Sequence, residues 1–328
     1  ILSLKNVSIY QENNLILSDI NLEVQKGEFL YFIGKTGSGK SSFMKVLYAD
    51  LPLKEGEGTI VDYNLNTLKE KDIPFLRRKI GIVFQDFKLL SDRSIKENLL
   101  FVLKATGWKD KLEMDAQINE VLEKVGMANF SSKMPHQLSG GEQQRVAIAK
   151  ALISNTKVLL LDEPFSQVDS LLKNQLRADI KRLAKETGLT IILVSHDPTD
   201  GLFLGDQLLI LKQGKLLQND SPAAIYKKPS DIYTAKILGN AVVLDANEAD
   251  KIGIKTDKKN IVFYPEWVEL KSTWNSRRFE VEDVYFKGFY DELLLERNGV
   301  KIRALQLNSG EHKKNDHVQA NIGRFLEF

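Results

Sequence analysis

The chain has 328 residues, of which 43% are hydrophobic and 27% are charged, and it contains no cysteine. This length predicts two domains, and the composition is that of a folded globular protein rather than a disordered one. A formal net charge of +2 gives no electrostatic reason to expect a nucleic-acid partner, and the lack of cysteine excludes disulfides and thiolate metal sites. No apolar run approaches the roughly 18–20 residues that span a bilayer, so a link to a membrane is expected to go through a partner protein.

The first part of the chain alternates short apolar stretches with helical patterns. Strands are predicted at residues 1–10, 21–24, 28–33, 80–84, 158–161 and 191–194, and helices at residues 41–47, 94–105, 111–125 and 140–153. Two of these strands, at residues 158–161 and 191–194, are fully apolar, as strands in the middle of a parallel sheet are. The alternation predicts a layered α/β domain.

The pattern changes near Gly239. Alternating strand patterns follow at residues 261–264, 279–286, 292–296 and 300–305, with turn residues between them such as Asn298-Gly299 and Asn308-Ser309-Gly310. No long helix is evident in this part. We therefore predict two domains, residues 1–238 and residues 239–328, of which the second is a small all-β domain.

A glycine-rich octapeptide lies between a predicted strand and a predicted helix, the context of a phosphate-binding loop. It consists of Gly34, Lys35, Thr36, Gly37, Ser38, Gly39, Lys40 and Ser41, and Ser42 follows it. The glycines let backbone N–H groups point at phosphate oxygens, and the helix N-terminus adds partial positive charge. Lys40 can supply a full charge at the β- and γ-phosphates, and the Ser41 hydroxyl can bind Mg²⁺. This pattern favours ATP binding over a plain glycine-rich turn.

Two carboxylates end the apolar strand at residues 158–161. Asp162 can hold the Mg²⁺ shell, and Glu163 can orient or deprotonate the attacking water. Alone, the pattern is equally compatible with a strand followed by an acidic turn. The phosphate-binding loop favours the catalytic interpretation.

A third motif, LSGGE, starts the predicted helix at residues 140–153. Ser139, Gly140, Gly141 and Glu142 can form a second anion site from a hydroxyl, exposed N–H groups and a helix dipole. Together, and in this order, the three motifs closely resemble those of the ATP-binding subunits of ABC transporters, over about residues 1–238. The resemblance implies a P-loop ATPase domain, with a mixed sheet and a helical subdomain, that uses ATP and Mg²⁺.

The resemblance also implies a homodimer packed head to tail, in which the phosphate-binding loop of one chain faces the LSGGE segment of the other with ATP between them. ATP then holds the dimer closed and hydrolysis releases it, a ligand-driven shift between two states. The implied partners are transmembrane permease subunits, with a substrate-binding protein as an additional candidate. The implied location is peripheral, on the cytoplasmic face of the inner membrane.

Four single residues match further family positions. Gln85 matches the glutamine that senses Mg²⁺ and the γ-phosphate and that lies in the segment touching the membrane subunit. Asp169 matches the loop that crosses the dimer, although the residues before it are larger than is common. His196 matches the switch histidine at the γ-phosphate, and Tyr10 the ring that stacks on adenine. Without the resemblance, Gln85 is compatible with a surface residue, His196 with a surface or capping residue, and Tyr10 with ordinary strand packing.

Different segments resemble different branches of the family. Residues 85–90 look like the bacterial cell-division ABC ATPase and its lipoprotein-release relatives, whereas residues 161–166 look like maltose- and polyamine-type importers. The turn Tyr264-Pro265-Glu266 resembles one in the small OB-type, TOBE-like β-barrel appended to importer ATPases, with tyrosine in place of the family's arginine. For that barrel the resemblance implies regulation or dimerisation.

Three hypotheses therefore remain. The leading one is an importer ATPase that drives a permease. The second is a division-type ATPase that signals through a small membrane partner and moves no substrate. A soluble ABC ATPase of DNA repair or translation is disfavoured, because the chain has one phosphate-binding loop and no heptad run.

Overall fold

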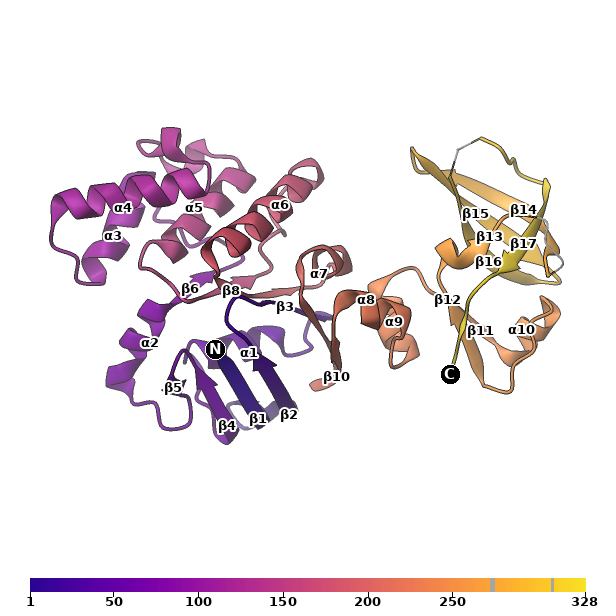
Figure 1. The fold of residues 1–328 in the computed structure, drawn as a ribbon, viewed down its shortest axis with the longest axis horizontal. Helices are drawn as coiled ribbons and strands as arrows, with labels where there is room; N and C mark the ends of the chain where they lie inside the picture. Colours follow the sequence, from indigo (N-terminus) through magenta and orange to yellow (C-terminus); the bar gives the residue numbers. More distant parts are fainter. Residues whose placement is uncertain (272–274, 308–309) are drawn as a thin grey trace. The chain divides into compact units, whose positions relative to one another are not determined.

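The structure is a computed structural model that describes residues 1–271, 275–307 and 310–328. It contains two compact units, Ile1–Ala223 and Ala224–Phe328 (Figure 1). The turn predicted at Asn308-Ser309-Gly310 lies partly outside the described residues. Within those residues, no helix is both long enough and apolar enough to cross a bilayer.

The first unit is built on one mixed sheet. Its strands are β1 (Leu2–Gln11), β2 (Asn14–Val24), β3 (Phe29–Gly34), β4 (Glu55–Ile60), β5 (Tyr63–Asn64), β6 (Ile80–Val83), β7 (Val158–Asp162), β8 (Thr190–Ser195), β9 (Gln207–Lys212) and β10 (Lys215–Asp220). They lie in the order β5-β4-β1-β2-β10-β9-β3-β8-β7-β6. Strands β9, β3, β8, β7 and β6 pair in parallel, whereas β1, β2, β4 and β5 pair antiparallel. The mixed sheet is confirmed.

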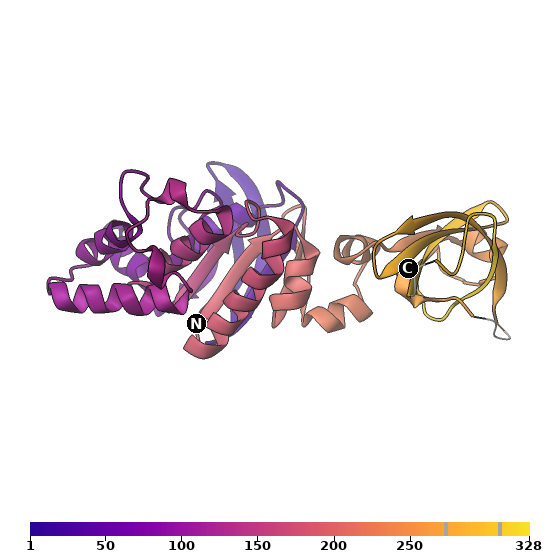
Figure 2. The same ribbon diagram turned by 90° about the horizontal axis from the view of Figure 1, so that it is seen from above.

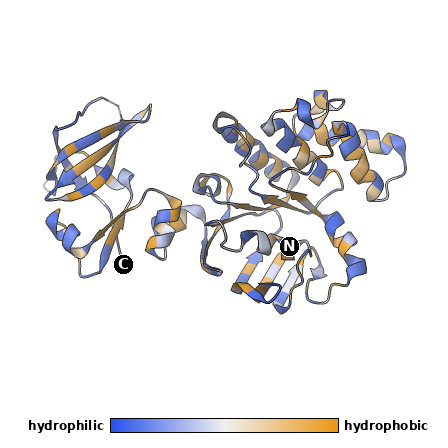
Figure 3. Cartoon of the chain, turned by 180° about the vertical axis from the view of Figure 1, so that it is seen from behind, coloured by the Kyte–Doolittle hydropathy of each residue, from blue (hydrophilic) through white to orange (hydrophobic). Residues whose placement is uncertain are grey.

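The parallel strands bring the ends of three segments to one edge of the sheet. Every residue of β3 and β8 is buried, and the central strands of this unit are coloured mainly as hydrophobic in Figure 3. The register pairs Ile33 with Ser195 and Asp162 with Val194. The loops that follow β3, β7 and β8 therefore leave the sheet side by side, where α/β sheets bind their ligands.

The helices of the first unit are α1 (Lys40–Leu47), α2 (Ile73–Lys79), α3 (Ile95–Ala105), α4 (Lys111–Lys124), α5 (Gly140–Leu152), α6 (Ser170–Thr187) and α7 (Pro198–Leu204), with 3₁₀ turns at Glu70–Asp72, Ala128–Phe130 and Pro135–Gln137. Helices α3, α4 and α5 pack on one another and form a group at one end of this unit (Figure 1, Figure 2). This group is the expected helical subdomain. Long amphipathic stretches made these helices predictable, whereas the short β4, β5, α2 and α7 gave no clear periodicity.

The second unit contains two antiparallel sheets and short helices. Its elements are α8 (Pro222–Lys227, which straddles the division), α9 (Ile232–Leu238), β11 (Val242–Asp245), α10 (Ala246–Lys251), β12 (Asn260–Phe263), a 3₁₀ turn (Pro265–Trp267), β13 (Val268–Glu269), β14 (Arg277–Phe286), β15 (Tyr290–Arg297), β16 (Val300–Leu307), β17 (His317–Ile322) and β18 (Leu326–Glu327). The sheets have the orders β11-β12-β18 and β13-β17-β14-β15-β16. The strands expected near residues 261, 279, 292 and 300 are all present, and the longest helix here has seven residues.

The division between the units lies earlier in the chain than the predicted boundary at residues 238/239. The ring of Tyr226 on α8 stacks on Tyr264, with centroids 4.3 Å apart, and Trp267 meets Tyr264 edge to face at 4.9 Å. Ala235 on α9 is buried against Tyr264 and Val262. These aromatic contacts tie α8 and α9 to the β-rich unit. A change of composition near Gly239 could not reveal them, because the two helices continue the helical pattern of the preceding domain.

We predict that Tyr226→Ala destabilises the second unit by about 1–3 kcal/mol, because it removes an aromatic pair and its buried area. Differential scanning calorimetry measures the unfolding temperature of each unit. The transition whose temperature does not change when ATP is added is assigned to the second unit. Tyr285→Ala is the matched control, since Tyr285 is exposed on the same unit. An unshifted transition in Tyr226→Ala would exclude α8 from the core of the second unit.

Candidate active site

The loop between β3 and α1 depends on glycine at two positions. Gly37 and Gly39 have φ angles of 79° and 105°, a left-handed backbone that other residues rarely adopt. A Cβ at Gly39 would also lie 2.5 Å from Cδ2 of Leu17. The loop can therefore keep this curved path only with glycine at these positions.

Two polar side chains of this segment, those of Lys40 and Ser38, are buried. Lys40 is 6% exposed, and its ammonium donates hydrogen bonds to the carbonyls of Gly34 (2.7 Å) and Lys35 (3.2 Å). Burial lowers the pKa of Lys40, and the carboxylates of Glu163 and Asp162 partly oppose this. The hydroxyl of Ser38 is buried without a hydrogen-bond partner. An orphaned donor beside a buried cation fits a loop that binds an anion.

A cavity of about 430 Å³ opens beside the loop and brings six segments of the chain together. It is lined by Gln11, Ile16, Thr36, Gly37, Gly39, Lys40, Ser41, Ser42, Gln85, Asp162, Glu163 and His196. All three predicted catalytic residues and all three predicted metal ligands are in this set. They come from the start of α1, the segment after β6, the end of β7 with the residue that follows it, and the residue after β8.

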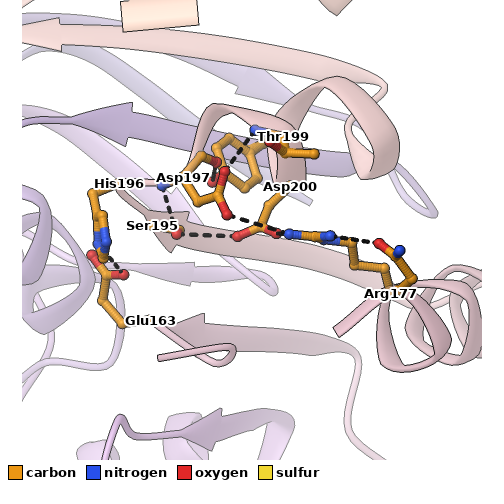
Figure 4. Close-up of polar contacts among 9 residues, drawn as sticks. Glu163, Arg177, Ser195, His196, Asp197, Thr199 and Asp200 are labelled. Atoms are coloured by element: carbon orange, nitrogen blue, oxygen red, sulfur yellow. Dashed lines mark hydrogen bonds and ion pairs between the residues drawn. The ribbon is translucent and has the colours of Figure 1, made fainter. Parts of the chain in front are cut away.

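Glu163 and His196 are in direct contact in this cavity. Nδ1 of His196 lies 2.8 Å from Oε2 of Glu163 (Figure 4). The backbone N–H of Glu163 donates to the carbonyl of Val194 at 2.8 Å, which fixes the start of the loop against β8. Glu163 has a φ of 47°, an uncommon backbone for a residue with a side chain and one often found at functional sites.

Three oxygen-bearing side chains fit a Mg²⁺ ion. Ser41, Gln85 and Asp162 line the same cavity, and hydroxyl, amide and carboxylate oxygens are the donors that Mg²⁺ prefers alongside substrate phosphates. Burial raises the pKa of Asp162, and the neighbouring Glu163 raises it further, against the opposing effect of Lys40 and Lys45. A cation at this position would offset the cost of that buried charge.

Tyr10 and Asp169 do not line this cavity. The hydroxyl of Tyr10 donates to a carboxylate oxygen of Glu55 at 3.0 Å, while Asp169 precedes α6 without a side-chain capping bond. Gln11 and Ile16, which no sequence motif marked, line the cavity instead. They lie there because β1 and β2 pair beside the phosphate-binding loop, a placement that only the sheet topology reveals.

The LSGGE segment also lies outside the cavity of its own chain. It begins α5 with a capping box, in which a carboxylate oxygen of Glu142 accepts from the Ser139 N–H (2.7 Å) and hydroxyl (2.8 Å). These hydrogen bonds lower the pKa of Glu142. A Cβ on Gly140 would lie 2.4 Å from the carbonyl oxygen of Gln167. The segment is thus rigidly built.

The family model described as "ABC transporter" matches residues 17–166. The chain is 31% identical to the spermidine/putrescine import ATP-binding protein of Clostridioides difficile (strain 630) over 319 residues. This alignment covers 91% of this chain and 89% of the relative. The chain belongs to the ABC transporter ATP-binding subunits. It is an ABC-type ATPase, and the P-loop fold expected from its motifs is confirmed.

Two further comparisons agree with this family. The Fe(3+) ions import ATP-binding protein of Haemophilus influenzae (strain ATCC 51907 / DSM 11121 / KW20 / Rd) is 31% identical over 92% of this chain and 89% of the relative. A solved dimer of an ATP-binding cassette, in a post-hydrolysis state bound to ADP and Pi, is 33% identical with a TM-score of 0.59, over 68% of this chain and 99% of that chain. ABC subunits of this kind bind ATP, dimerise and work with membrane permeases.

We predict that Asp162→Asn stabilises the nucleotide-free chain at pH 7 and abolishes its ATPase activity. The raised pKa of Asp162 means that its charge costs stability at pH 7, and asparagine removes that cost. As the pH falls, the wild-type carboxyl takes up its proton in the folded state before it does so in the unfolded state. The stability advantage of Asp162→Asn over the wild type therefore shrinks, and it vanishes below the ordinary pKa of about 3.9. Thermal unfolding across pH measures the effect.

Asp62→Asn is the control for this variant, because Asp62 is exposed. Its midpoint should follow that of the wild type at every pH. An equal or lower midpoint for Asp162→Asn at pH 7 would contradict the assigned cost of the buried carboxylate.

Proposed function

We propose that this chain is the energising subunit of an ABC importer, in which residues of the cavity beside the phosphate-binding loop bind and hydrolyse ATP. The observation that carries the proposal is that the phosphate-binding loop, Gln85, Asp162, Glu163 and His196 line one cavity. The relatives from both organisms are named import ATP-binding proteins, which favours import over the division-type alternative.

Each residue has a role that follows from its position. ATP phosphates replace the Gly34 and Lys35 carbonyls as partners of the Lys40 ammonium, and they accept from the loop N–H groups. Glu163 orients the attacking water and accepts its proton, while His196 holds Glu163 and reaches the γ-phosphate. Ser41, Gln85 and Asp162 would hold a Mg²⁺ ion, which would neutralise charge on the phosphates. Tyr10 stays a candidate for contact with adenine, provided that its bond to Glu55 opens.

The position of the LSGGE segment supports a head-to-tail homodimer. Ser139, Gly140, Gly141 and Glu142 cannot serve the cavity of their own chain, because they do not line it. In a second copy they close the open side of the site with N–H groups at a helix N-terminus, and Asp169 lies at the dimer contact. The dimeric cassette in a post-hydrolysis state is similar to this chain over 99% of the cassette and 68% of this chain.

A groove of about 380 Å³ next to Gln85 is suited to a permease segment. It is lined by residues of α2, β6, α3 and α5 and by the loop after β6. Its lining includes Arg77, Arg78, Lys88 and Lys150 and no carboxylate. We assign this groove to a permease segment that carries acidic side chains. With such a partner, we propose that the chain lies peripherally on the cytoplasmic face of the inner membrane.

The remaining assignments are less specific. Residues 239–328, together with the helices that pack on them, form a TOBE-like domain for regulation or dimerisation. A substrate-binding protein is the expected third component of the importer. The two relatives share the same 31% identity with this chain but are named for a polyamine and a metal ion, so we assign no cargo.

We predict that Glu163→Gln keeps Mg-ATP binding, loses ATP hydrolysis and accumulates as a closed dimer. The glutamine fills the same space but cannot accept the proton of the attacking water. Phosphate release measures turnover, and size-exclusion chromatography with light scattering in Mg-ATP measures the dimer. Glu186→Gln, an exposed substitution on α6, should behave as the wild type. Wild-type turnover by Glu163→Gln would refute the assigned role.

We also predict that Arg78→Glu weakens association with the permease. Arg78 is exposed at the basic groove, so reversal of its charge repels an acidic partner segment. Co-purification from detergent-solubilised native membranes, read by mass spectrometry, measures the loss. Lys69→Glu is the control, being exposed outside this groove. Recovery of a small, few-span membrane partner in place of a permease would support the division-type alternative.

A further inference from the structure

A buried ion pair connects α6 to the segment that carries His196. Arg177 on α6 is 6% exposed and Asp200 on α7 is 0% exposed. Nε and Nη2 of Arg177 lie 2.6 and 2.5 Å from Oδ1 of Asp200. Nη2 also lies 3.3 Å from Oδ2 of Asp197, and Nη1 donates to Asn174 at 2.8 Å. Arg177 is therefore held in one orientation at the start of α7 (Figure 4).

This ion pair fixes the residues on both sides of His196. The Ser195 hydroxyl donates to the second carboxylate oxygen of Asp200 at 3.2 Å and accepts from the N–H of Asp197 at 3.1 Å. The hydroxyl of Tyr31 donates to the Asp197 carbonyl at 2.5 Å. His196 itself is exposed and has only its bond to Glu163 among these groups. Its backbone is thus positioned by its two neighbours, and through them by Asp200 and Arg177.

We propose that the Arg177–Asp200 ion pair positions His196 against Glu163 for ATP hydrolysis. The pair touches neither the cavity nor the reacting atoms, so both residues are positioning residues rather than catalytic ones. Arg177 lies about two helical turns along α6 from Asp169, which ends the predicted dimer-crossing loop. The ion pair thus connects the helix that follows this loop with the segment that carries His196.

The energetics favour this role over a purely structural one. Burial raises the pKa of Asp200, and the hydrogen bond and charge of Arg177 only oppose that rise. A buried ion pair is often no more stabilising than apolar residues of similar volume. Apolar packing at residue 200 would therefore serve stability equally well. Because Asp200 is instead a charged residue bonded to Ser195 and Arg177, we expect it to orient the segment that carries His196.

The first experiment compares Asp200→Asn with a matched control. Asp179→Asn removes a carboxylate from α6, the helix of Arg177. Asp179 pairs with Arg145 of α5 there and does not contact the His196 segment. We expect Asp200→Asn to lower kcat about 10- to 100-fold, the size of effect that follows from a misplaced catalytic group, with an unchanged KM for ATP. Asp179→Asn should keep the wild-type kcat. Equal losses in both variants, or a wild-type kcat in Asp200→Asn, would overturn the proposal.

A second readout follows the histidine directly. The chain has four histidines, so the ring nitrogens of His196 can be assigned in ¹⁵N-histidine spectra with a His196→Gln reference. In Asp200→Asn we expect the His196 signals to shift and those of the other three histidines to stay. Unchanged His196 signals would contradict a positioning role.

A third variant separates stability from position. Arg177→Met/Asp200→Leu replaces the pair with apolar side chains and is expected to fold with near wild-type stability. If the pair positions His196, kcat stays low in this folded variant, because Ser195 has lost its acceptor. If the double variant recovers the wild-type kcat, the pair is only structural and the proposal fails.

The inference rests on the proposed roles of Glu163 and His196, and the two can fail separately. His196→Gln and Glu163→Gln are measured alongside. If both retain wild-type turnover, the site assignment itself is wrong. If both are inactive while Asp200→Asn turns over normally, the site stands and only the positioning role of the pair is lost.

Discussion

The site depends on the register of three parallel strands. Ile33 of β3 lies opposite Ser195 of β8, and Asp162 of β7 lies opposite Val194 of the same strand. All three strands therefore end at the same edge, within two residues of one another. A slip in this register would turn the following side chains to the other face of the sheet. The fully buried, apolar interior of β3 and β8 prevents such a slip, so hydrophobic packing determines where the polar groups meet.

The polar groups at this edge are held at a cost that the apolar interior offsets. Burial lowers the pKa of Lys40 and raises the pKa of Asp162, which disfavours the charged form of each. Glu163 adopts a left-handed backbone conformation. Asp200 on α7 is fully buried and forms an ion pair with Arg177. Natural active sites commonly combine strained or desolvated groups with a rigid scaffold, because preorganised charges act strongly in a site that excludes water.

Much of this arrangement could be predicted from the sequence, and the limits have physical causes. Gly34 to Ser41, Asp162 and His196 each follow an apolar strand, and the ends of parallel strands meet in space, so the local pattern implied the site. Gln11 and Ile16 carry no such pattern, because their position depends on an antiparallel pairing beside the loop. Tyr226 and Tyr264 lie far apart in sequence, and their stacking moves α8 and α9 into the second unit. Long-range contacts of this kind leave no periodic signal.

The separation of the LSGGE segment from the cavity of its own chain has a kinetic consequence. A catalytic centre that needs surfaces from two copies exists only while those copies are together, so turnover by free chains varies with the square of their concentration when they are dilute. A scaffold that holds two copies side by side replaces this bimolecular encounter with an effective local concentration. A membrane assembly with two equivalent docking positions would thereby start the ATPase simply by gathering its subunits, before any cargo arrives.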